Sequence, residues 1–117
     1  MRVWLDDERP APAGWVATKW PHEVIVHLQT GTVKEISLDH DLGNDDVGTG
    51  YSVILWIEEA VMTRGFRPPK IAVHSANPAA RRKMELGVES IYRNYHALNP
   101  KQGIFGLAAK MVRRRLG

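Results

Sequence analysis

The sequence contains no cysteine and no long run of apolar residues. Without cysteine the chain forms no disulfide, no thiolate nucleophile and no thiolate zinc site, which suits a cytoplasmic protein. A membrane-spanning helix needs roughly 18 or more consecutive apolar residues, and no run approaches that length. Residues 1–6 reach an acidic side chain too early for the apolar segment of a signal peptide. We therefore expect a cytoplasmic protein without a membrane partner.

Length and composition predict a single globular domain. The chain has 117 residues, of which 44% are hydrophobic and 25% charged. These values are ordinary for a soluble domain, and the length allows one modest core. We expect residues 1–117 to form one domain.

Charge is divided unequally along the chain, although the net charge is only +3. Residues 1–62 carry four Lys or Arg and eleven Asp or Glu, whereas residues 63–117 carry twelve Lys or Arg and two acids. The basic half would suit an anionic partner such as a phosphate ester or nucleic acid. Alternatively, the two halves attract one another within the fold.

Apolar runs and breakers predict strands that alternate with helices. Strands are expected at 2–5, 15–19, 33–38 and 70–73, and helices at 21–29, 49–64, 78–95 and about 106–116. This alternation predicts an α/β fold, a three-layer sandwich around a mainly parallel sheet of four to five strands. About nine residues separate the first two strands, too few for a crossover helix. Either that pair is antiparallel or the second strand is absent.

Three polar strings follow directly on apolar strands: Asp6-Asp7-Glu8-Arg9, Asp39-His40-Asp41 and His74-Ser75-Ala76-Asn77. The carboxyl ends of parallel strands form the crevice in which open α/β sheets bind ligands. We therefore expect carboxylates, imidazoles and a hydroxyl to meet at one edge of the sheet.

The first string offers two adjacent carboxylates, Asp6 and Asp7, which suit a hard cation such as Mg²⁺. Arg9 would either pair with Asp6 or bind phosphate through its planar guanidinium. The plainer interpretation is an acidic turn exposed to water.

The second and third strings supply the candidate acid–base groups. His40 lies between Asp39 and Asp41, which suits a general acid, although the string is also compatible with a solvated loop. His74 ends a different strand and is the second candidate. Ser75, Asn77 and Arg81 lie at or near the start of the next helix, where backbone N–H groups bind anions. Asn77 before Pro78 also has a structural explanation as a helix cap.

Together these strings resemble the cyclic-phosphate processing branch of the receiver superfamily. The branch motifs are matched by residues 5–9, 37–43 and 74–77, and Gly50 and Ser75-Ala76 match further receiver positions. The resemblance spans about residues 2–84 and implies a small receiver-like, flavodoxin-like fold. The helix that receivers place between their first two strands is missing or degenerate here, and Lys101 is a poor match to the receiver lysine.

The resemblance implies a metal-assisted phosphoesterase that opens cyclic phosphates on RNA ends or nucleotides. Asp6, Asp7 and Asp39 would hold a divalent cation, Mg²⁺ or Mn²⁺, and His40 and His74 would share the general acid and base roles. Asp41 would assist them, while Arg9, Ser75, Asn77 and Arg81 would bind the substrate.

The alternative is a non-catalytic binding or inhibitor protein built on the same scaffold. It would dock on nucleic acid or on an acidic protein surface through the basic half, including the predicted C-terminal helix at about 106–116. Leu55 and Met62, opposite the apolar stripe of the helix at 49–64, would be contact residues. The oligomeric state stays open.

Overall fold

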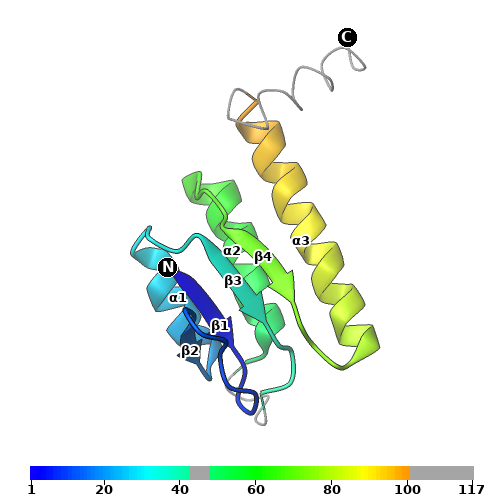
Figure 1. Cartoon of the computed structure of the whole chain (residues 1–117). Coiled ribbons are helices and arrows are strands. Elements are labelled where there is room, and N and C mark those ends of the chain that lie inside the picture. Colours follow the sequence, from blue (N-terminus) through cyan, green and yellow to red (C-terminus); the bar gives the residue numbers. More distant parts are fainter. Residues whose placement is uncertain (43–47, 101–117) are drawn as a thin grey trace.

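The computed structural model describes residues 1–42 and 48–100, so the predicted helix at about 106–116 lies outside the described residues. The elements alternate along the chain as Figure 1 shows. They are β1 (Arg2–Leu5), β2 (Val16–Thr18), α1 (Pro21–Gln29), β3 (Glu35–Leu38), α2 (Gly50–Arg64), β4 (Lys70–Val73) and α3 (Pro78–Leu98).

The four strands form one sheet in the order β2-β1-β3-β4, and every pair is parallel. This confirms the predicted α/β class and the receiver-like fold without a helix between β1 and β2. Both alternatives for the first two strands are wrong, because β2 is present and runs parallel to β1. Residues 6–15 make that crossover without a helix. The indole of Trp15 in this loop packs edge-on against Trp4 of β1, with ring centroids 6.0 Å apart.

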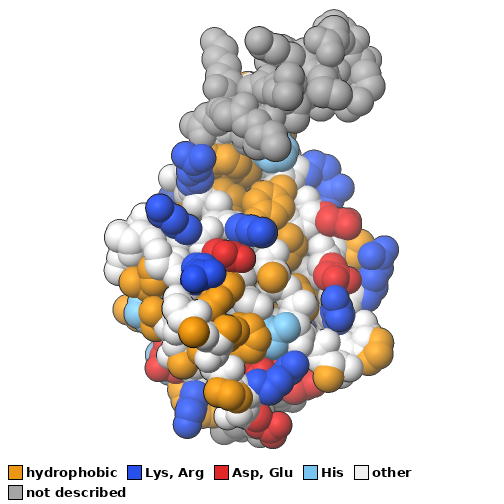
Figure 2. Space-filling view, viewed as in Figure 1, with side chains coloured by type: hydrophobic (Ala, Val, Ile, Leu, Met, Phe, Trp, Pro, Cys, Tyr) orange, Lys and Arg blue, Asp and Glu red, His pale blue; other side chains and the backbone are white. Residues whose placement is uncertain are grey.

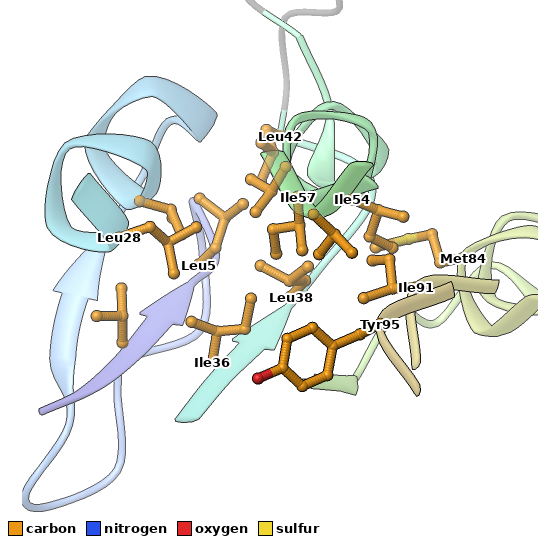
Figure 3. Packing of buried hydrophobic residues seen from close by; sticks show 14 residues of the cluster. Leu5, Leu28, Ile36, Leu38, Leu42, Ile54, Ile57, Met84, Ile91 and Tyr95 are labelled. Carbon is orange, nitrogen blue, oxygen red and sulfur yellow. The ribbon is translucent and has the colours of Figure 1, made fainter. Parts of the chain in front are cut away.

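The hydrophobic core lies between the sheet and the helices. Side chains alternate across a strand, and one face of β1 and β3 contributes Val3, Leu5, Ile36 and Leu38, all fully buried. These side chains meet apolar residues of α1, α2 and α3, with Ile57 and Ile91 among them (Figure 3).

Helices α1 and α2 lie behind the sheet in Figure 1, while α3 packs along α2 and β4. Within residues 1–42 and 48–100 the helices therefore cover one face of the sheet, and the third layer of the expected sandwich is not among these elements. Figure 2 shows hydrophobic side chains interspersed with charged ones on the side that faces the viewer. No helix in the described part of the chain has the length and hydropathy needed to cross a bilayer.

Local signals fix the helix ends that border the site. The hydroxyl of Thr49 accepts a hydrogen bond from the Tyr51 N–H and caps α2, while Gly65 ends that helix in the left-handed conformation, with φ of 65°. The side chain of Asn77 accepts from the Ala80 N–H and caps α3. The cap predicted for Asn77 is therefore present, and α3 runs three residues beyond the predicted end at residue 95.

Candidate functional site

The site is built at the carboxyl ends of β1, β3 and β4. Leu5, Leu38 and Val73 are register partners across these strands and precede Asp6, Asp39 and His74. The N–H of Asp39 donates to the Leu5 carbonyl, and the N–H of His74 donates to the Leu38 carbonyl, both at 3.0 Å. Because successive side chains alternate between faces, the three polar residues emerge side by side, as the strand pattern predicted.

Asp6 is the most enclosed carboxylate of this edge, with a side chain only 1% exposed. One oxygen accepts from the backbone N–H groups of Glu8 and Arg9, both at 2.9 Å. The other accepts from Arg9 Nε at 3.0 Å and is 3.1 Å from His74 Nε2. Burial alone would raise the pKa of Asp6, but the two backbone hydrogen bonds, His74 and the Arg9 charge together lower it. Asp6 is therefore ionised at neutral pH.

Arg9 lies between the acids and joins three strand ends. Besides its bond to Asp6, its Nη2 donates to the His74 carbonyl at 2.9 Å and lies 3.8 Å from Asp39 Oδ1. The Trp4 indole N–H donates to the Arg9 carbonyl at 3.1 Å and so fixes this turn from the sheet side. The predicted pairing of Arg9 with Asp6 is therefore present. Its side chain is 50% exposed, so part of it faces solvent.

Asp39 completes an acidic cluster with Asp6 and Asp7. Burial raises the pKa of Asp39, and the negative charge of Asp6 adds to this, while the His40 N–H bonded at 2.8 Å acts in the opposite direction. The three carboxylates each offer an oxygen, and these oxygens lie within 4.8 Å of one another.

The donor set of this cluster fits a hard divalent cation. Mg²⁺ and Mn²⁺ prefer carboxylate oxygens, and Asp6, Asp7 and Asp39 could hold such an ion. Both Asp6 oxygens already accept hydrogen bonds, so a cation there competes with Arg9 for the same carboxylate.

His74 is held on three sides. Its Nδ1 lies 2.7 Å from Ser37 Oγ and its Nε2 lies 3.1 Å from Asp6 Oδ2. The ring stacks on Trp4, with centroids 3.9 Å apart and planes 6° from parallel. Burial lowers the pKa of His74 despite the nearby Asp6 carboxylate, so the neutral ring is favoured. Both ring nitrogens face protein groups, which the sequence did not indicate.

His40 is more open than His74. Its side chain is 23% exposed, and Nδ1 lies 2.8 Å from Asp41 Oδ1, so Asp41 orients the ring. Among the described residues no hydrogen bond involves His40 Nε2. Within the same part of the chain, no hydrogen bond or ion pair joins His40 to His74. An imidazole oriented through one nitrogen, with the other available, is the arrangement of a general base.

Ser75, Asn77 and Arg81 make local contacts at the start of α3. The buried Ser75 hydroxyl accepts from the Asn77 N–H at 3.2 Å, and Asn77 caps the helix. Arg81 Nε lies 3.4 Å from Glu85 one turn further on. These contacts account for all three residues structurally, and their predicted substrate-binding role stays a prediction.

A cavity of about 370 Å³ opens beside the acids, above the ends of β1 and β2. Asp6, Asp7 and Arg9 line one part of it, and Lys19, Trp20 and other residues beyond the end of β2 line another. The sequence analysis did not identify Lys19 and Trp20, because the short segment between the first two strands predicted that the second strand was antiparallel or absent. A parallel β2 places its carboxyl end, and therefore Lys19 and Trp20, at the same edge as the three polar strings.

The cavity wall has an excess of negative charge. Four carboxylates face two cationic side chains, which gives a formal charge of −2. The acids are Asp6, Asp7, Glu8 and Glu23, and the cations are Arg9 and Lys19. An anionic phosphate would be repelled by this wall, and one bound divalent cation would bring its formal charge to zero.

Comparison with known proteins gives one result. A family model described as cyclic-phosphate processing receiver domain matches residues 1–90, which include the whole sheet and every strand-end residue of the site. No curated protein and no solved structure matches the chain.

Proposed function

The chain belongs to the cyclic-phosphate processing receiver domain family, and we propose that it is a metal-assisted phosphoesterase that opens a cyclic phosphodiester. The substrates would be 2′,3′-cyclic phosphates on RNA ends or on nucleotides. The observation that carries the proposal is the acidic cluster of Asp6, Asp7 and Asp39, with the hydrogen-bonded His40–Asp41 pair directly after Asp39 in the chain.

The acidic cluster would hold Mg²⁺ or Mn²⁺. When bound, the cation would withdraw electron density from phosphate oxygens and offset the charge of the cavity wall. Arg9 would bind a phosphate oxygen with the exposed part of its guanidinium while remaining tied to the His74 carbonyl. Ser75, Asn77 and Arg81 would contribute to phosphate binding from the start of α3.

The chemistry needs one proton acceptor and one proton donor. The oxygen of a water molecule attacks phosphorus, and the bond between phosphorus and one ribose oxygen breaks. A base removes a proton from the water, and an acid protonates the departing ribose oxygen, which leaves a phosphate monoester. His40 is oriented by Asp41, and its Nε2, which makes no hydrogen bond to the described residues, would be the atom that takes part in such a transfer. His74 is the second candidate, although the ring must release Asp6 or Ser37 before it exchanges a proton with substrate.

The test is turnover of 2′,3′-cyclic nucleotides and of RNA with a cyclic-phosphate end, in the presence of Mg²⁺ or Mn²⁺. Each general acid or base contributes about 10²–10⁴-fold, so the His40→Ala/His74→Ala double variant should lose at least 10²-fold in kcat. His22→Ala is the matched control, because His22 is an exposed histidine of α1. Equal turnover by the wild type and the double variant refutes the assignment.

A non-catalytic binding protein is the second candidate, and one observation favours it. Leu55 and Met62 of α2 are 48% and 57% exposed, on the side of the helix away from the core. Exposed apolar residues of this kind are typical of protein interfaces. Binding to nucleic acid or to an acidic protein that persists in Asp39→Ala and His74→Ala variants would favour this function.

A further inference from the structure

The cavity beside the acidic cluster has a second part that the phosphate chemistry does not use. Besides the acids and Arg9, its lining includes Trp20 and the small apolar residues Pro10, Ala11 and Ala17. A phosphate group needs only the charged residues. The aromatic and aliphatic residues would contact an apolar, flat part of a ligand.

The walls of this second part are fixed by hydrogen bonds from β1, β2 and α1. Glu23 Oε1 accepts from the backbone N–H groups of Lys19 and Trp20, both at 2.9 Å. The Thr18 hydroxyl donates to the Trp4 carbonyl at 2.8 Å, and the Asp6 N–H donates to the Thr18 carbonyl at 3.1 Å. These hydrogen bonds tie the residues beyond the end of β2 to β1 and to the first turn of α1.

The size of the cavity limits the ligand. Pockets for small ligands span about 300–1,000 Å³, and this one, at about 370 Å³, lies near the lower end. It would accommodate one nucleoside rather than a stretch of polymer. Trp20 lines the cavity and is half-buried against the core, so its ring is restrained by packing and its exposed part would be available for contact with a base. Lys19 and Glu23 add polar groups of both signs that could bond to the edge of a base.

We propose that the cavity between Arg9 and Trp20 binds the nucleoside part of a cyclic nucleotide, with the base against Trp20 and the cyclic phosphate at the acidic residues. This inference rests on the proposed phosphoesterase function and specifies its substrate. A cyclic phosphate without a base would leave the aromatic residue without a contact and would be the poorer substrate.

The experiment compares adenosine 2′,3′-cyclic monophosphate with glycerol 1,2-cyclic phosphate, which has the same cyclic phosphodiester but no base. The variant is Trp20→Leu, and the control is Trp56→Leu, a half-buried tryptophan whose ring packs against Phe66. The measured quantity is the ratio of kcat/KM for the two substrates. Loss of base stacking should lower the ratio by about tenfold in Trp20→Leu, and Trp56→Leu should leave it at the wild-type value. An unchanged ratio in Trp20→Leu overturns the proposal.

A second variant covers the case in which Trp20→Leu does not fold. Ala17 is exposed on β2 and lines the cavity, so Ala17→Leu should fill the space and lower the same ratio about tenfold. Ala72→Leu, at an exposed position of β4 away from this cavity, is its control. Equal ratios in both alanine variants overturn the proposal.

Direct binding separates this inference from the catalytic proposal. Calorimetry with adenosine 3′-monophosphate and Mg²⁺ requires no turnover. If neither cyclic phosphate is hydrolysed, the phosphoesterase function fails, and a tenfold weaker affinity in Trp20→Leu than in Trp56→Leu still supports the nucleoside cavity. No binding by the wild type, or equal binding by both variants, overturns it.

Discussion

The contact between α2 and the end of β3 leads to a sharp prediction for Gly50→Ala. Gly50 opens α2, and its N–H donates to the His40 carbonyl at 3.3 Å. A Cβ at this position would overlap the carbonyl oxygen of Asp39 and lie 2.8 Å from its carbonyl carbon and 2.9 Å from Met84 Cε. Because the first two atoms are backbone, the start of α2 must move away from Asp39 by about 1.5 Å to restore ordinary contact.

The expected cost follows from these contacts. Overpacking costs about 1–3 kcal/mol, and the backbone hydrogen bond to His40 adds about 1 kcal/mol. The better helix propensity of alanine returns at most about 1 kcal/mol. We expect Gly50→Ala to lower the free energy of unfolding by about 2–3 kcal/mol, and to lower Tm by about 8–12 °C. Urea and thermal denaturation followed by circular dichroism measure both.

Gly31→Ala is the matched control. Gly31 has φ of 76°, and no atom lies within 4 Å of an added Cβ, so alanine there would be strained but would overlap nothing. It should cost about 1 kcal/mol. The close approach of α2 to Asp39 is refuted if Gly50→Ala is no less stable than Gly31→Ala.

Three further predictions concern charge and hydrogen bonding. Mg²⁺ at a hundredfold excess over its Kd should stabilise the wild type by about 2.7 kcal/mol, which is measured as a higher Tm that a chelator reverses. An Asp39→Asn variant should show little shift in Tm. An equal shift in both proteins would contradict a metal site at this carboxylate. Tyr92→Phe should cost about 1–3 kcal/mol in urea denaturation, because its hydroxyl donates to a carbonyl at 2.6 Å and accepts from an N–H of β4 at 3.1 Å; a cost no larger than that of Tyr51→Phe would contradict this. Burial raises the pKa of Glu58 above its usual 4.5, so the charged form of this side chain destabilises the folded state. The destabilisation is complete above the folded-state pKa. It disappears as the pH falls toward 4.5, because the carboxyl group is then protonated in both the folded and the unfolded state. Glu58→Gln should therefore be more stable than wild type at pH 7, with the gain vanishing in acid. Glu59→Gln, at an exposed neighbouring position, is the control for the loss of one negative charge from α2, and an equal gain in both variants would contradict the prediction.

Most of the fold follows from local signals in the sequence. Pro21 at the first turn of α1 and Gly31 beyond its end mark that helix, and the same kind of signal places α2 within one residue, between Thr49 and Gly65. The predicted end of α3 at residue 95 follows the last residue of its buried apolar face, whereas the helix runs on to Leu98, where Asn99 and Pro100 interrupt it. The breaker residues therefore mark this end better than the apolar periodicity does.

The parallel β2 could not be derived from loop length. Residues 6–15 form a short segment for a crossover between parallel strands. Tertiary contacts, rather than the length of the loop, stabilise this connection. Trp15 packs on Trp4, and the Thr18 hydroxyl donates to the Trp4 carbonyl, which holds β2 beside β1. Such contacts depend on side chains that meet only after the strands pair, so no short window of sequence contains them.

The strand-end residues of the site were predictable, but their partners were not. Asp6, Asp39 and His74 follow from the strand pattern, whereas Ser37 and Trp4, which hold the His74 ring, look like ordinary strand residues. The alternation of side chains along a strand does contain a signal. Trp4 lies two positions before Asp6, and Ser37 lies two positions before Asp39, so each shares a face of the sheet with that acid. The same face of β1 and β3 therefore carries the Trp4 indole and the Ser37 hydroxyl to the end of β4, where both contact His74.

Two tryptophans, Trp4 and Trp15, shelter the site on the face of the sheet that no described helix covers. Trp4 stacks on His74, Trp15 packs edge-on against Trp4, and the Arg2 guanidinium lies 5.3 Å from the Trp15 ring centroid. In receivers a helix follows the first strand, and here a ten-residue loop ending in Trp15 takes its place. Because the stack excludes water from one side of His74, it contributes to the burial that keeps this ring neutral and bonded to Asp6. The loop at residues 6–15 therefore also helps to fix the histidine at the acidic edge, through Asp6 and Arg9 directly and through the packing of Trp15 on Trp4.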